Sequence, residues 1–354
     1  GTLPVPVVGH EAAKEVLWDE LLRVERTGEC RRVSLVGCRG GHRRSLAEAF
    51  VQCAREVGCG AGRVQVWFGS DPPPAGPCLW LGEDVVDADV VVPVLLLSPS
   101  QCRDALASWI ALPPRWVTDL SLRCGADLAL AVASVREAMA SGWVHAAERG
   151  LVAQGPIPWS PAGVEAWRHA LDQAPEGLGE FLCTAAIVPS VVRLQELCID
   201  ADVGLAWLLE AGLAEVKDGA LRWASGALQA LVQERDAERI GRHLRAAQNE
   251  TDPWSRGVHL LRGGRLRQGA EALLREVGTV ASSGRMVECE GVLRELEAAM
   301  ADAIPQSDPL WAVLFDAFAQ VGPTHLGYQT CTQYGEKAVA LALQNPDDAQ
   351  WKAT

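Results

Sequence analysis

The spacing of hydrophobic residues changes near residue 100, and this change divides the chain into a strand-rich first part and a helical remainder. Before residue 100, short apolar runs rich in β-branched residues predict buried strands, separated by glycine- and proline-rich loops. After residue 100, apolar residues recur every three or four positions, as on the buried face of a helix. We therefore expect a small parallel α/β sheet followed by a helical region. The predicted strands are residues 33–36, 63–68, 78–81 and 90–97, and a helix is predicted at residues 10–26.

The stretch from Arg31 to Phe50 organises the first part, because it reads as a strand, a glycine-rich loop and a helix in succession. The apolar run 33–36 leads into the loop sequence GCRGG at residues 37–41, and a helical stripe follows from Leu46 to Val57. This order is typical of a phosphate-binding loop, where backbone amides and a helix N-terminus bind an anion.

The residues that would complete such a loop differ from the usual pattern. Counting from Gly37, the motif G-x-x-x-x-G-K-[ST] requires glycine, lysine and serine or threonine, where this chain has His42, Arg43 and Arg44. A one-residue insertion would place Arg44 and Ser45 in the last two roles, but the lysine would still be replaced. Arginine has a larger, planar head than lysine, and His42 adds a Cβ where backbone must approach phosphate closely. The sequence thus predicts the architecture of a nucleotide site with altered chemistry.

Paired carboxylates follow the predicted strand 78–81. Glu83 and Asp84 stand where an NTPase with a phosphate-binding loop holds Mg²⁺ and orients water, so they are the candidate catalytic residues. The alternative is that Glu83, Asp84, Asp87 and Asp89 form a solvated turn between strands, and the local sequence taken alone favours that alternative. If a nucleotide binds, its predicted contacts are Gly37, Gly40, Gly41, Arg43, Arg44 and Ser45.

A compact module is predicted between residues 164 and 235. Its hairpin is expected at Asp218-Gly219, a dipeptide that favours the tightest turns between strands. Three helices and a hairpin are typical of a winged helix, a fold that often binds DNA. Residues 183–235 carry four basic and seven acidic side chains, so we expect a structural wing. The predicted short helices are residues 164–172, 178–186, 191–198 and 203–210.

A repeat follows residue 236. The sequence HLLRGGRLRQGAEALLREV at residues 259–277 is echoed by TVASSGRMVECEGVLREL at residues 279–296. Gly264 aligns with Gly284, and a glycine turn before an apolar helix face is typical of stacked helix hairpins. A further helix pair is predicted at residues 310–318 and 327–343.

Composition narrows the possible partners. The chain has 354 residues and a net charge of −13 without a basic tail, which argues against nucleic acid. Its eleven cysteines lack C-x-x-C pairs, and we interpret them as reduced side chains of a cytoplasmic protein. The histidines lack metal-site spacing, so no metal is expected, and no apolar run approaches the ~18 residues of a membrane span. Because residues 345–354 end where another helix could begin, we expect a longer polypeptide.

These segments, in this order, resemble the signal-transduction ATPases with numerous domains (STAND), which are AAA+-like P-loop NTPases. The sequence VVGHE at residues 7–11 is similar to the family's hhGRE, with His10 replacing the arginine. Residues 35–46 resemble its phosphate-binding loop, and residues 78–89 resemble its Walker B segment. Residues 207–234 resemble the family's winged helix. Residues 259–274 and 282–296 resemble its tetratricopeptide arm.

The resemblance implies a fold, a cofactor and site residues. It makes Glu83-Asp84 the Walker B carboxylates, Arg103 the nearest candidate for a sensor arginine, and ATP or ADP the candidate ligand. The helix that the family has between Walker B and the next strand is missing from this sequence. The implied order is a degenerate P-loop NTPase-like α/β domain at residues 1–112, a helical domain with linkers at 113–180, a winged helix at 181–235, and a tetratricopeptide-like solenoid at 236–354.

Three functional hypotheses follow. The first is a non-hydrolysing, NTPase-like regulatory scaffold that binds a protein partner through residues 254–343. The second is an ATP-dependent signalling switch that controls an effector, and the pairing of Glu83 with Asp84 supports it. The third is a DNA-binding regulator, which the acidic wing argues against. The altered loop favours the first hypothesis.

Overall fold

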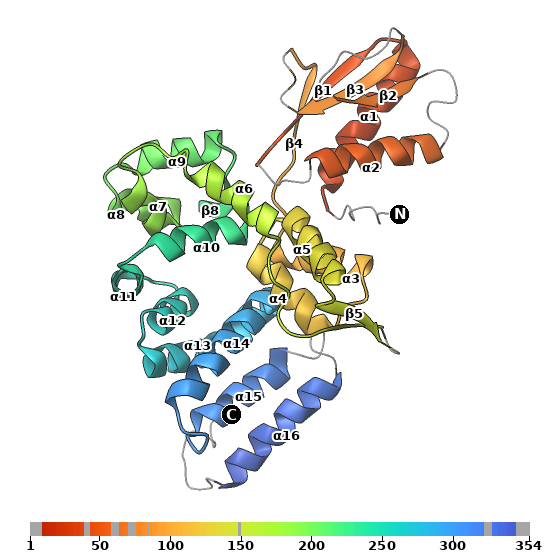
Figure 1. The fold of residues 1–354 in the computed structure, drawn as a ribbon. Coiled ribbons are helices and arrows are strands. Elements are labelled where there is room, and N and C mark those ends of the chain that lie inside the picture. The colour runs from red at the N-terminus through yellow and green to blue at the C-terminus, as the bar shows by residue number, and fades with distance from the viewer. Residues whose placement is uncertain are drawn as a thin grey trace.

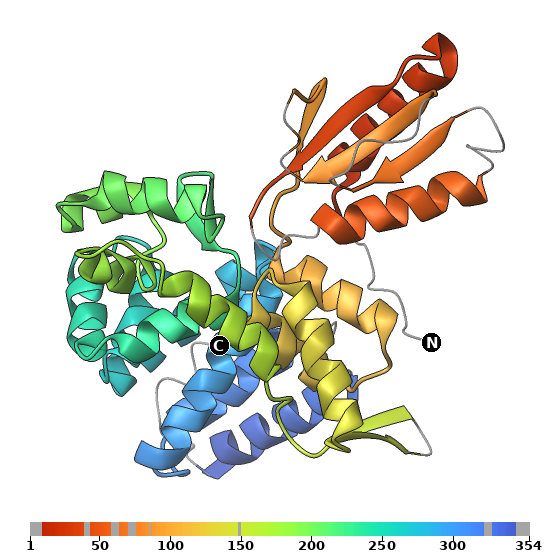
Figure 2. The same ribbon diagram turned by 45° about the horizontal axis from the view of Figure 1, so that its top comes forward.

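A computed structural model describes residues 9–38, 43–57, 64–69, 76–83, 85, 87–147, 150–321 and 328–344. An α/β unit built from the first part of the chain projects from a larger body made mostly of helices (Figures 1 and 2). Among the described residues, no helix has the length and apolar character needed to cross a membrane.

The α/β unit contains a four-stranded parallel sheet in the order β2-β3-β1-β4, which confirms the predicted parallel sheet. The central strand β1 pairs with β3 on one side and with β4 on the other. The strand β4 ends earlier than the predicted residue 97, because the chain leaves the sheet toward the body. The bounds are β1 Arg31–Val36, β2 Gln65–Phe68, β3 Cys78–Glu83 and β4 Val90–Pro93.

Helices α1 (Glu11–Thr27) and α2 (Arg43–Glu56) pack on one face of this sheet. Their rings meet at Trp18 and Phe50, whose centroids lie 4.9 Å apart in an edge-to-face contact. The buried sheet residues alternate along the strands and belong to the same apolar cluster: Val33, Leu35, Leu79, Leu81 and Val92. Strand and helix periodicity therefore decide which face forms the core.

The opposite face of the sheet is only partly covered, although parallel sheets usually bury both faces. The return from β3 to β4 has only six residues, too few for a helix, and its described residues, Val85 and 87–89, cross this face. Val85 donates its backbone N–H to the Ser34 hydroxyl at 3.1 Å, and Trp67 and Val91 remain 40% and 59% exposed. The missing helix noted in the sequence is therefore replaced by a short crossing segment.

A group of helices follows the sheet and shares one apolar core with the module after it. Helix α3 packs into this core and not against the sheet, although the predicted boundary at residue 112 grouped it with the sheet. The division into four domains stays a prediction. The helices are α3 Pro99–Trp109, α4 Pro114–Cys124, α5 Leu128–Ala140 and α6 Pro161–Leu171.

A hairpin of β5 (Val144–Ala147) and β6 (Gly150–Ala153) interrupts the helices, and the prediction of an almost wholly helical region was wrong here. Gly142 adopts φ 76° just after α5, a conformation that ends the helix and turns the chain. Along the strands, only Val144 and Ala153 are buried. With so few buried apolar residues, the alternation that marks a strand is weak in the sequence.

The predicted short helices and the hairpin after them are confirmed. Asp218 and Gly219 form the two-residue turn with φ values of 52° and 74°, as the Asp-Gly dipeptide favours. Ser190 adds an isolated antiparallel bridge to Ala220. We call residues 179–235 the hairpin module. It comprises α7 Gly179–Ala185, α8 Val191–Leu197, α9 Ala201–Glu210, β7 Ala214–Lys217, β8 Ala220–Trp223 and α10 Gly226–Arg235.

The remaining helices form an arm (residues 239–344) with an apolar core of its own. Helix α12 packs along α13, and α15 packs along α16 (Figure 1). Gly264 and Gly284, aligned in the sequence repeat, both adopt positive φ at the turns before α13 and α14. The helices are α11 Arg239–Asn249, α12 Pro253–Arg262, α13 Leu266–Ser282, α14 Met286–Ala303, α15 Leu310–Val321 and α16 Tyr328–Gln344.

Two buried histidines contact each other between α11 and α12, the first helices of the arm. From their burial we predict that the stability of the fold depends on pH. The Nδ1 atoms of His243 on α11 and His259 on α12 lie 3.1 Å apart. Burial lowers the pKa of His243 to about 3, with a further lowering by His259, and burial lowers the pKa of His259 to about 4. The unfolded chain, with histidine pKa values near ~6.5, therefore binds more protons than the folded chain between about pH 6.5 and pH 4.

The free energy of unfolding should fall as the pH is lowered through this window, by roughly 2 kcal/mol for each histidine between about pH 7 and pH 5. Urea denaturation of the wild type and of a His243→Phe/His259→Leu variant at several pH values measures the effect. The variant should lose most of this dependence, whereas His145→Gln, at an exposed position on β5, should keep it. An equal pH dependence in all three proteins would contradict the prediction.

Candidate functional site

The predicted nucleotide site lies at the carboxyl edge of the sheet, where β1 and β3 end side by side. In the parallel register Leu35 is level with Glu83, so the residues after Val36 emerge beside this carboxylate. In open parallel sheets, ligands bind outside the carboxyl ends of strands where the strand order reverses, and β1 lies between β3 and β4 in this sheet. The parallel register therefore places the start of the loop, Gly37 and Cys38, at the same edge of the sheet as Glu83.

Arg43 and Glu83 form an ion pair at this edge. The Nη2 atom of Arg43 lies 3.3 Å from the Oε2 atom of Glu83. The arginine side chain is 13% exposed and the glutamate side chain 39% exposed. The cation at the expected phosphate-binding position thus contacts the carboxylate at the expected Mg²⁺-binding position.

The other predicted site residues are distributed differently. Arg44 pairs with Glu48 along α2, with Nε and Oε1 2.8 Å apart, and its side chain is 76% exposed. Ser45 is half-buried in the first turn of α2. Arg103, the sensor candidate, pairs with Asp104 on α3, a helix that contacts α14 of the arm. The loop residues Gly40, Gly41 and His42 and the carboxylate Asp84 lie outside the described residues.

The solvated-turn alternative holds for part of the acidic segment. Asp89 lies at the amino end of the sheet, where its Oδ2 accepts the backbone N–H of Arg32 at 2.8 Å and its Oδ1 lies 3.3 Å from Arg31 Nη1. Asp87 adopts φ 58° in the crossing segment. Among the three of these carboxylates that the structure describes, Glu83 is the one placed at the carboxyl edge.

Gly37, the first glycine of the loop, is required by the backbone of the segment that leaves β4. A Cβ on Gly37 would lie 2.4 Å from the Val94 carbonyl oxygen, and Val94 donates its N–H to Val36 at 2.8 Å. The next residue, Cys38, is buried in the core of the body. Burial, together with the neighbouring carboxylate of Glu215, raises the pKa of its thiol to about 12. The start of the loop is therefore packed against protein.

A pair of charged residues on the hairpin module holds the same segment. Glu215 on β7 and Arg222 on β8 lie opposite each other, with 2.8 Å between Oε1 and Nη1. Glu215 accepts the backbone N–H of Leu96 at 3.0 Å, and Arg222 donates to the Leu97 carbonyl at 2.7 Å. Sequence reasoning missed this contact, although the Asp-Gly turn already fixed the register that pairs the two charges.

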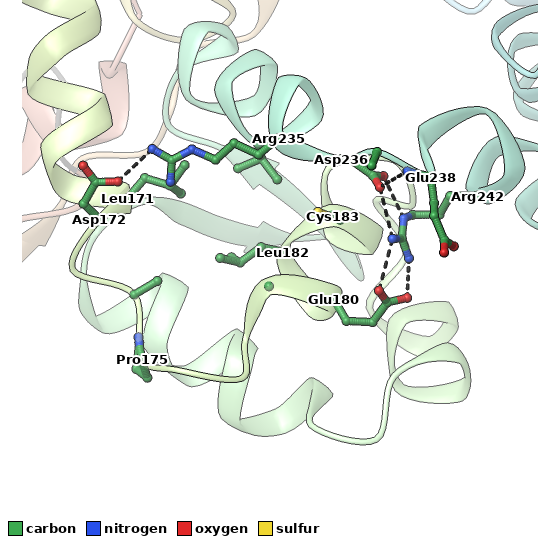
Figure 3. Close-up of a pocket in the computed structure, with 14 residues that line it drawn as sticks. Leu171, Asp172, Pro175, Glu180, Leu182, Cys183, Arg235, Asp236, Glu238 and Arg242 are labelled. Atoms are coloured by element: carbon green, nitrogen blue, oxygen red, sulfur yellow. Dashed lines mark hydrogen bonds and ion pairs between the residues drawn. The ribbon is translucent and has the colours of Figure 1, made fainter.

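A cavity of about 600 Å³ lies between α6, α7, α10 and α11, far along the chain from the predicted nucleotide site (Figure 3). Apolar side chains of Leu171, Leu182 and Val232 line it, together with Cys183. Ion pairs stand at its two ends in Figure 3. At one end Arg235 pairs with Asp172 at 2.7 Å, and the other end is built around Arg242.

Arg242 joins the arm to the hairpin module. Its side chain is 7% exposed, and its guanidinium contacts Asp236 at 2.8 Å through Nε and both carboxylate oxygens of Glu180. It also donates to the Thr184 hydroxyl at 3.2 Å. Hydrogen bonds from Arg242 lower the pKa of both Glu180 and Asp236. Because all these charges are engaged with each other, this end of the cavity acts as a structural link between α7 and α11.

Within the described residues, no group of three histidine, cysteine, aspartate or glutamate side chains is arranged to hold a metal ion.

Comparison with known proteins gave similarity to solved structures alone. No family model matches the sequence, and no curated protein matches it. Among solved structures, the chain is similar to a STAND protein with a tetratricopeptide repeat sensor from Pyrococcus horikoshii, at 13% sequence identity and a TM-score of 0.29. The alignment covers 97% of this chain and 65% of the Pyrococcus horikoshii chain. This chain therefore spans less than two thirds of the length of that protein. Similarity at this level does not place the chain in a family.

The link at Arg242 predicts a large loss of stability when it is broken. Arg242→Met leaves the buried carboxylate of Asp236, 3% exposed, without its partner and should lower the free energy of unfolding by about 3 kcal/mol. The matched control is Arg245→Met on the same helix, where the pair with Glu238 is exposed and the loss should stay below about 1 kcal/mol. Urea denaturation measures both, and equal losses would contradict a structural role for Arg242.

Proposed function

We propose that this chain is a non-hydrolysing, NTPase-like regulatory scaffold of the STAND type, and the ion pair between Arg43 and Glu83 carries the proposal. In a working phosphate-binding loop, the lysine contacts the β- and γ-phosphates while the Walker B carboxylate binds Mg²⁺. Here the two charges satisfy each other. A nucleotide would have to separate them before either could act on phosphate or metal.

The rest of the edge supports the same conclusion. Gly37 and Cys38 are packed against Val94 and the core, so the start of the loop has little freedom to wrap around an anion. Arg44 occupies the position of the Mg²⁺-binding hydroxyl, and it contacts Glu48 on the helix surface. On this proposal the loop is a degenerate Walker A motif, and bound ATP or ADP is not needed for the fold.

In this proposal the hairpin module is the winged helix and the arm is the tetratricopeptide-like solenoid. The partner is a protein that binds residues 254–343. Two features of the arm support this assignment. Val339 and Leu343, one turn apart on α16, are 59% and 75% exposed, and exposed apolar pairs on a helix are suited to packing against another protein. A cavity of about 460 Å³ also opens between α4 and the arm, lined by Arg123, Arg262 and Glu295 among others.

An ATP-dependent signalling switch is the second candidate, and the contact of Glu215 and Arg222 with Leu96 and Leu97 favours it. This contact lies beside Gly37 and Cys38, so a change in the loop would reach the hairpin module directly. The two candidates differ in whether the carboxyl edge hydrolyses nucleotide.

The purified chain should hydrolyse ATP at well below about 1 s⁻¹, the low end of ordinary enzymes. The physical reason is that Arg43 and Glu83 neutralise each other and no lysine stands at the loop. Steady-state phosphate release with Mg²⁺ measures the rate, with Glu83→Gln as the matched variant. A rate near 1 s⁻¹ that Glu83→Gln abolishes would refute the scaffold proposal and establish the switch.

A protein partner should be lost when the exposed apolar residues of α16 are replaced. In affinity purification, Val339→Asp/Leu343→Asp should lose a partner that the wild type retains, because a charge would be buried in the interface. Arg43→Ala and Val57→Asp, an equally exposed valine after α2, should keep it. The reverse pattern would move the partner surface to the α/β unit.

A further inference from the structure

The hairpin module presents an exposed apolar surface that the proposed function does not use. Helices α8 and α9 lie at the edge of the body away from the α/β unit (Figure 1). Three β-branched residues there are more than half exposed: Val192 at 61%, Ile199 at 104% and Val203 at 62%. Leu197 and Leu209 are also more than 40% exposed. Apolar side chains gathered in this way mark an interaction site more often than scattered ones do.

The exposed residues of the two helices form one surface, which we call the α8–α9 face. On α8, Val192 and Gln195 are exposed one turn apart, and on α9 the exposed arc runs through Asp202 and Val203 to Ala206. The amide of Gln195 donates to Asp202 Oδ1 at 2.8 Å, so the two arcs meet at this hydrogen bond. Ile199 lies in the turn between the helices. Val192, Ile199 and Val203 therefore border a shared seam.

The rim of the α8–α9 face is acidic. Glu196, Asp200, Asp202 and Glu210 provide four carboxylates, whereas Arg193 is the single basic residue between positions 190 and 211. Arg193 is engaged, because its Nε lies 3.4 Å from Glu196 and its guanidinium donates to the Asn249 carbonyl. Its side chain is only 18% exposed. An apolar centre within a negative rim is complementary to an apolar stripe flanked by positive charge.

Nucleic acid does not fit this surface. In a helix-turn-helix arrangement the second helix enters the major groove, and phosphate contacts from lysine and arginine supply most of the affinity. The sequence of α9, ADVGLAWLLE, contains neither residue and carries two carboxylates. A second copy of this chain is also disfavoured, because its net charge is −13.

We propose that the α8–α9 face binds a basic amphipathic helix of a partner protein. The occupant places apolar residues, spaced at three and four positions, on Val192, Ile199 and Val203, as an amphipathic helix does when its apolar face packs on a partner. Lysines or arginines beside that stripe face Glu196, Asp200 and Glu210. This site is independent of the arm residues 254–343 and of the nucleotide edge, so it stands if either part of the proposed function fails.

The test uses the full chain and a synthetic 18-residue helical probe, about five turns long, with a leucine stripe and flanking lysines. Calorimetry or fluorescence anisotropy should show binding that weakens as salt is raised, because the rim charges are exposed. A probe with the lysines replaced by glutamates should not bind. Ile199→Asp and Val203→Asp should each weaken binding by about tenfold or more through loss of an apolar anchor.

The control against general attraction to an acidic chain is Val57→Asp, an equally exposed apolar position after α2, which should leave the affinity unchanged. Both positions on the α8–α9 face are exposed, so the variants are expected to fold, and circular dichroism checks this. Three results would overturn the proposal: equal binding by the Asp variants and the wild type, duplex DNA bound through the same residues, or a dimer in sedimentation that Val203→Asp dissociates.

Discussion

The arrangement of the molecule depends on the extended segment that leaves β4, because it joins the α/β unit to the body. Extended backbone that is covered by protein must find partners for its N–H and C=O groups. Val94 donates to β1, whereas Leu96 and Leu97 bond with Glu215 and Arg222 of the hairpin module. One short segment thus completes the sheet on one side and is held by the charged pair on the other. The α/β unit is oriented through these contacts, and its own apolar core stays separate from that of the body.

The same constraint shapes the candidate site. Since Gly37 must lie against the Val94 carbonyl and Cys38 enters the core, the loop begins as part of the packing between the two parts. A loop that binds phosphate needs its amides directed at the anion. The ion pair of Arg43 with Glu83 then closes the other side of the edge. The two proposals make this edge either a non-hydrolysing nucleotide-site relative or a switch. In both cases its residues connect elements of the fold.

Sequence periodicity predicted most elements, because each depends on local spacing of apolar residues. The strands of the sheet, the short helices of the hairpin module, the turn at Asp218-Gly219 and the paired glycines Gly264 and Gly284 belong to this class. The resemblance also made the loop and Glu83 parts of one site, and the parallel register places Glu83 level with the end of β1. The sequence could not show that Arg43 would bind Glu83, nor that Arg242, one arginine among many, would be buried between two carboxylates. The contacts of Arg43 with Glu83 and of Arg242 with Glu180 join residues 40 or more positions apart. The contact of Arg242 with Asp236 depends on which face of α11 is covered.

Arginine's geometry bears on the proposal that the carboxyl edge does not hydrolyse nucleotide. The chain contains 28 arginines and 4 lysines, so an arginine at position 43 is in keeping with its composition. Arginine differs from lysine in presenting a planar fork that matches a carboxylate, and this chain uses that fork repeatedly, with Arg262 on Glu295 and Arg242 on Glu180 as two-pronged examples. The flexible ammonium of a lysine can move between a carboxylate and a phosphate at little geometric cost. The planar guanidinium of an arginine leaves a carboxylate that it matches less readily. On the proposed function, Arg43 and Glu83 therefore stay paired with each other, and the contacts that hold the fold around them do not depend on a nucleotide.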